Sequence, residues 1–118
     1  LSALCGTTVA ATGACCGIVL LLGGGLGHMS KAINNMIGNV TGIICDGAKN
    51  SCSLKANSSV SAAVHSALLA MADQGVSGDE GIVANDAEES IRNLGRLTKE
   101  GMLETDKVIL DIMVNKNK

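Results

Sequence analysis

The chain of 118 residues contains no Phe, Tyr, Trp or Pro. Its core must therefore be built from Ala, Val, Ile, Leu, Met and other small side chains. Strands are enriched in aromatic residues, so this composition favours closely packed helices. We expect an all-α domain of about five helices with glycine-rich turns.

Positive charge is also scarce, because nine Lys and Arg face eleven Asp and Glu. Without a basic surface for phosphates or aromatic rings on which bases could stack, we expect no nucleic-acid partner. The first thirty residues carry no formal charge, but Gly and Thr interrupt the apolar run and Gly23–Gly25 ends it early. That length is short for a bilayer, so we expect no transmembrane helix and a cytoplasmic location.

Apolar residues at spacings of three and four predict the helices. Small and aliphatic residues all round residues 7–22 indicate a helix surrounded by protein, and Gly13 and Gly17 would allow close backbone approach. Ser30 is the expected N-cap of a second helix, which points its C-terminal end at Cys45. Residues 45–54 are rich in turn formers and predict an ordered loop.

Three further helices complete the predicted fold. The third covers about residues 58–72, the fourth is capped by Asn85 or Asp86, and the last covers about residues 99–115. Residues 74–83 are polar and glycine-bearing, and predict a loop. The expected apolar faces are Val60, Val64, Leu68 and Met71 in the third helix, Ala87, Ile91, Leu94 and Leu97 in the fourth, and Met102, Thr105, Ile109, Ile112 and Met113 in the last.

Five cysteines are an odd number, and Cys15 and Cys16 are adjacent within an apolar helix. A disulfide scaffold is therefore not expected, and these two thiols are interpreted as core packing. Cys45 and Cys52 flank a polar loop whose backbone N–H groups could satisfy thiolate or sulfide charge. Their C-x6-C spacing matches neither structural zinc sites nor the common ferredoxin run, so spacing alone leaves metal binding open.

Several stretches, in one order along nearly the whole chain, resemble the L-cysteine desulfidase-like branch of the iron–sulfur L-serine dehydratase alpha-chain family. They are residues 2–6 (SALCG), 34–36 (NNM), 45–52 (CDGAKNSC) with 54–55 (LK), 91–95 (IRNLG), and 101–113 with its GM, TD and ILDIM matches.

The resemblance implies a mainly helical lyase with a [4Fe-4S] cluster that three cysteines hold, leaving the fourth iron open for substrate. The matching positions are Cys5, Cys45 and Cys52, with Cys15 as a rival for the first place. An iron without a protein ligand acts as a Lewis acid towards a carboxylate or a β-leaving group. The implied reaction is β-elimination from a small L-amino acid, giving pyruvate and ammonia.

The catalytic base is not identified by the sequence. His28 and His65 are candidates by residue type, but each is better explained as a structural or exposed side chain. Lys49 lies in the cysteine loop and could meet a substrate carboxylate, although a solvated loop lysine is the usual case.

The chain starts at Leu1 and enters an apolar segment at once, which favours a fragment of a longer protein. The resemblance implies that residues 1–118 are the C-terminal, cluster-binding part of a serine dehydratase alpha-type catalytic domain. Its expected partners are a small L-amino-acid substrate and the missing N-terminal half of the same protein, and a homo-oligomer is left open. The alternative is a non-catalytic helical domain, structural or binding zinc through Cys45, Cys52 and a histidine.

Overall fold

The computed structural model describes residues 3–116, and this part of the chain is helical with no strand. The all-α prediction is therefore confirmed. Residues 3–116 contain five α-helices. The last two are joined by a π-helical turn, η1 (Leu97–Gly101), into one continuous helical segment, so that four separate helical segments result. The helices are α1 (Gly6–Leu21), α2 (Leu26–Val40), α3 (Cys52–Met71), α4 (Ala87–Arg96) and α5 (Met102–Asn115).

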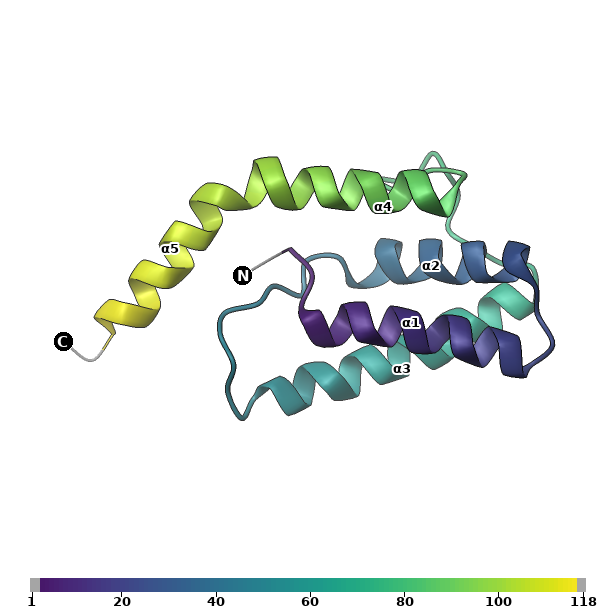
Figure 1. Ribbon diagram of the computed structural model, residues 1–118, viewed down its shortest axis with the longest axis horizontal. Helices are drawn as coiled ribbons and strands as arrows, with labels where there is room; N and C mark the ends of the chain where they lie inside the picture. The colour runs from purple at the N-terminus through teal and green to yellow at the C-terminus, as the bar shows by residue number, and fades with distance from the viewer. Residues whose placement is uncertain (1–2, 117–118) are drawn as a thin grey trace.

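Helices α1, α2 and α3 form a bundle (Figure 1). Helices α1 and α3 run in the same direction, and α2 is antiparallel to both. Near the start of α1, the hydroxyls of Thr8 and Ser59 share a hydrogen bond of 2.8 Å across to α3. At the other end, a Cβ at Gly24 would lie 2.6 Å from Met71 Sδ. Both contacts place the N-terminal ends of α1 and α3 at the same end of the bundle.

Most side chains of the core between these helices are small, and Met36 is the largest that is fully buried. The core is formed by Leu4, Ala11, Cys15, Val19, Ala32, Met36, Val40, Ala62, Ala63, Ala67 and Ala70. Helix α4 packs on α2, while α5 bends away from the bundle (Figure 1). None of the helices in residues 3–116 combines the length and apolar character needed to cross a bilayer.

Two predicted helix starts are wrong, and so is the predicted end of the second helix. Helix α2 begins four residues before Ser30, with Gly25 as its N-cap, and it ends at Val40, well before Cys45. The chain leaves the helix through Gly42, whose φ of +109° is one that glycine adopts readily. Helix α3 begins at Cys52 itself, so residues 52–54 are its first turn and not part of a loop.

The predicted inward faces of α3 and α5 are also wrong. Helix α3 buries its Ala and Ser face, whereas Val60, Val64 and Leu68 are exposed. In α5 only Met102 is buried. We also predicted that protein surrounds α1. Residues 3–116 do not surround it, because none of their atoms outside α1 lies within 4 Å of a Cβ placed at Gly13 or Gly17. The side chain of Asp86 caps α4 by accepting a hydrogen bond from the Glu88 N–H. Of the two predicted caps, Asn85 and Asp86, the second is therefore confirmed.

Candidate functional site

Cys5 and Cys52 are both placed at helix N-termini, at the same end of the bundle. Cys5 is the N-cap of α1 and only 6% exposed, and Cys52 is the first residue of α3 and half-buried. Because α1 and α3 are parallel neighbours, the positive ends of two helix dipoles lie at this end. Such ends stabilise thiolates and other anions.

The segment that carries Cys45 is attached to the same end by backbone hydrogen bonds. The Cys5 N–H donates to the Ile43 carbonyl at 2.6 Å, and the Gly42 N–H donates to the Ala3 carbonyl at 2.9 Å. Farther along, the Cys52 thiol donates to the Gly47 carbonyl at 3.7 Å. The structure thus brings the three predicted cysteine ligands to one end of the bundle, Cys45 and Cys52 half-buried and Cys5 buried.

The thiol of Cys5 is tuned by its surroundings. Desolvation raises its pKa, but hydrogen bonds from Thr7 and Thr8 and the charge of Lys55 outweigh this effect, so the pKa of Cys5 is lowered from its ordinary value. A lowered pKa favours the thiolate, which is the form that binds metal.

Asp46 and two lysines organise the loop between Cys45 and Cys52. The Asp46 carboxylate accepts hydrogen bonds from the Lys49 and Lys55 ammonium groups. These bonds hold the pKa of the carboxyl well below its usual range. Lys55 also donates to the Ile44 carbonyl at 2.7 Å. Both Asp46 and Lys55 lie in the stretches that resemble the family, but the sequence alone predicted no role for either.

The rival ligand Cys15 lies elsewhere. It is fully buried in the core and ten residues along α1 from Cys5, which is about 15 Å at the rise of an α-helix. Burial, followed by the neighbouring Cys16, raises the pKa of Cys15 to about 11. Its position therefore argues for Cys5 as the first ligand, and it agrees with the interpretation of Cys15 as core packing.

Neither histidine lies with the cysteines. His28 Nε2 is 3.5 Å from an oxygen of Asp73, which lies just beyond the far end of α3. His65 is thirteen residues along α3 from Cys52, about 20 Å by helical rise. A zinc site built from Cys45, Cys52 and a histidine is therefore not supported. Among residues 3–116, no three His, Cys, Asp or Glu side chains are grouped so as to hold a single metal ion.

A hollow of about 420 Å³ lies beside the cysteine loop. Its wall is shared between the loop, including Asp46, Gly47 and Lys49, and the last turns of α5, including Met113. Lys49 pairs with Asp46 and also donates to the Gly47 carbonyl at 3.4 Å. The residues on both sides of Cys45, Ile44 and Asp46, line this hollow.

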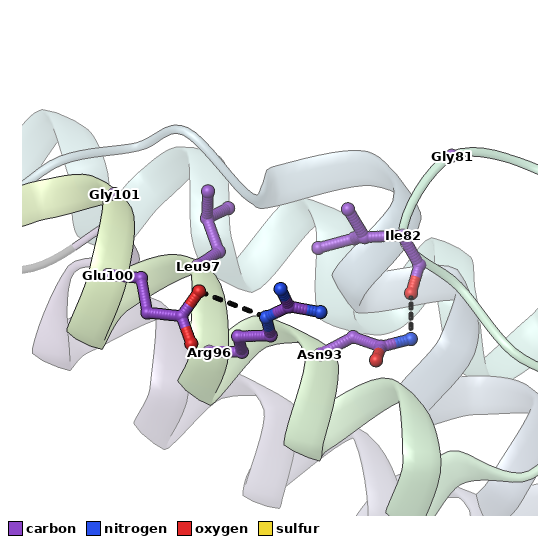
Figure 2. Close-up of a pocket in the computed structure, with 7 residues that line it drawn as sticks. All are labelled: Gly81, Ile82, Asn93, Arg96, Leu97, Glu100 and Gly101. Carbon is purple, nitrogen blue, oxygen red and sulfur yellow. Dashed lines mark hydrogen bonds and ion pairs between the residues drawn. The ribbon is translucent and has the colours of Figure 1, made fainter.

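Another hollow, of about 500 Å³, lies between α4, η1 and the loop before α4 (Figure 2). Its polar groups are already paired: Arg96 with Glu100 at 3.0 Å, and the Asn93 amide with the Ile82 carbonyl at 2.9 Å. No cysteine lines it, so it is not the site that the sequence predicts.

The fold and the site define a helical domain that presents three thiols at one end. The model of the family described as serine dehydratase alpha chain matches residues 1–111, and the chain belongs to this family.

Several curated relatives are similar to this chain over nearly its whole length. The chain is 59% identical to a UPF0597 protein of Oleidesulfovibrio alaskensis and to one of Phocaeicola vulgatus, each over 98% of this chain and 27% of the relative. It is 56% identical to a UPF0597 protein of Photobacterium profundum, with the same coverage. The chain thus spans about a quarter of the length of these relatives. No solved structure matches it.

Proposed function

We propose that this chain is the cluster-binding, C-terminal part of an iron–sulfur-dependent lyase of the L-serine dehydratase and L-cysteine desulfidase type. The carrying observation is that Cys5 and Cys52 occupy adjacent helix N-termini and that backbone hydrogen bonds attach the Cys45 segment beside them. Membership of the serine dehydratase alpha chain family supports the lyase class.

The three thiols fit a [4Fe-4S] cluster by their chemistry. Each cysteine of such a cluster binds a different iron, so the three sulfurs need not converge on one point as they would for a single metal ion. Cys5, Cys45 and Cys52 are the proposed ligands, and three ligands leave one iron open. An open iron would supply a Lewis acid for the substrate carboxylate or for the group leaving the β-carbon.

The proposed reaction is a β-elimination. A base removes the α-proton of the amino acid, and the β-carbon loses its hydroxyl as water or its thiol as hydrogen sulfide. The resulting aminoacrylate takes up water and gives pyruvate and ammonia. Within this chain, Lys49 at the hollow beside the loop is the candidate to meet the substrate carboxylate, exchanging its present partner Asp46 for it. Neither histidine lines the hollow beside the loop.

The rest of the protein is the proposed partner of the exposed apolar faces. Val64 and Leu68 of α3 are 43% and 54% exposed, and among residues 3–116 nothing outside α1 lies within 4 Å of a Cβ placed at its Gly13 or Gly17. Since about three quarters of the length of the relatives lies outside this chain, we assign these faces to helices of that remainder, which also supply the missing base. All five cysteines are free, as is typical of a reducing compartment such as the cytoplasm.

The test uses the full-length protein, reconstituted anaerobically with iron and sulfide. Wild type should turn brown and bind about four irons per chain. Cys52→Ala should abolish most of this binding, whereas the matched variant Cys16→Ala should retain it because Cys16 lies in the middle of α1. A folded, colourless wild type would refute the proposal. Pyruvate release from L-serine and from L-cysteine then identifies the substrate.

A further inference from the structure

A single ammonium group connects the segments that carry Cys45 and Cys52. Lys55, in the first turn of α3, donates to the Ile44 carbonyl at 2.7 Å and to the Asp46 carboxylate at 2.9 Å. These two acceptors flank Cys45. The Lys55 side chain is 24% exposed, so the contacts are shielded from water on most sides.

The same ammonium is within electrostatic reach of the other two cysteines. The pKa of Lys55 is raised chiefly by its hydrogen bond to Asp46 and, in smaller part, by electrostatic interaction with Cys5 and Cys52. Lys55 follows Cys52 by three residues and therefore lies on the same side of α3. Cys5 is tied by its backbone to Ile43, next to the Ile44 carbonyl that Lys55 binds.

Lys49 provides a useful contrast. It pairs with the same Asp46 carboxylate, but its remaining contact is the Gly47 carbonyl within its own loop. Its side chain is 38% exposed, and it does not connect the loop to α3. Both lysines thus have the same charge and share one partner, while only Lys55 bridges separate segments.

We propose that Lys55 is a positioning residue for the cluster: it holds the Cys45 segment against Cys5 and Cys52, and its charge offsets the net negative charge of a cluster with three thiolate ligands. This inference rests on the proposed function. Nearby charge and hydrogen bonds set both the retention and the reduction potential of such clusters.

The experiment compares full-length wild type with Lys55→Met, Lys49→Met and Lys55→Arg after anaerobic reconstitution. Lys55→Met should hold the cluster roughly tenfold less tightly against a chelator, the order expected from losing one charge-assisted hydrogen bond. The cluster that remains should have a more negative reduction potential, because a nearby positive charge that favours the reduced form is gone. Lys49→Met should match wild type in retention, and Lys55→Arg should restore the potential.

Circular dichroism checks that each variant is folded, and Lys55→Arg still tests the charge if Lys55→Met does not fold. The inference is overturned if Lys55→Met keeps the retention and potential of wild type, if Lys49→Met has the same effect, or if Lys55→Arg leaves the potential shifted. A wild type that binds no cluster would instead overturn the proposed function. The two failures are therefore distinguishable.

Discussion

Asn35 holds α2 to two other parts of the fold, and we predict that its loss is costly. The side chain is 4% exposed. Its amide donates to the Ser66 carbonyl at 3.2 Å and to the Gln74 carbonyl at 3.3 Å, and its oxygen accepts from the Val76 N–H at 2.9 Å. At about 1 kcal/mol for each hydrogen bond, Asn35→Ala should lower the free energy of unfolding by about 3 kcal/mol. Marginally stable domains have only about 5–15 kcal/mol in total.

Urea unfolding of the protein containing this chain measures this cost. Asn39→Ala is the matched control, because Asn39 lies on the same helix one turn later and is exposed, so its replacement should change the free energy by less than about 0.5 kcal/mol. Hydrogen exchange gives a local readout, since the Val76 amide should exchange faster only in Asn35→Ala. Equal free energies of unfolding for the two variants would refute the assigned role of Asn35.

Two further predictions concern the contacts inside the bundle. The pKa of Cys15 is raised from 9.0 to about 11, so the folded state keeps a proton that the unfolded state loses between these values. The free energy of unfolding should therefore fall as pH rises from 9 to 11, by roughly 3 kcal/mol, and Cys15→Ala should flatten that fall; equal slopes in urea titrations would contradict it. Thr8→Val should cost about 2 kcal/mol by leaving the Ser59 hydroxyl unpaired, and adding Ser59→Ala should recover part of this loss. Strictly additive costs in the double-mutant cycle would show that the two hydroxyls do not interact.

The fold class followed from composition, but the faces of the helices did not. Val60, Val64 and Leu68 have the spacing of an inward face, and this spacing predicted their burial. The structure buries Ala63, Ala67 and their neighbours instead, because small side chains let α1 and α3 approach closely. Hydrophobic periodicity alone does not distinguish a face buried within a chain from one that another part of a longer protein covers.

The grouping of the cysteines could not be predicted from spacing. Cys5 is forty residues from Cys45, and backbone hydrogen bonds from Cys5 to Ile43 and from Gly42 to Ala3 bring the two segments together. The sequence did not indicate the role of Lys55, because its partners Ile44 and Asp46 are about ten residues away. The segment between them was predicted to be a loop, but it contains the first turn of α3. The signal available was the combination of an acidic and a basic residue around two cysteines.

The lack of aromatic residues bears directly on the site. Thr8 and Ser59 share a buried hydrogen bond, which sets the register of α1 against α3 near the start of α1 and about two turns into α3. A large side chain at either position would separate the two helices at the end where Cys5 and Cys52 begin them. The positive ends of the two helix dipoles would then lie farther apart. Small residues in the core are therefore a condition for the thiol arrangement, and enlarging Ala63 to Leu should disturb cluster binding although no atom of Ala63 belongs to the site.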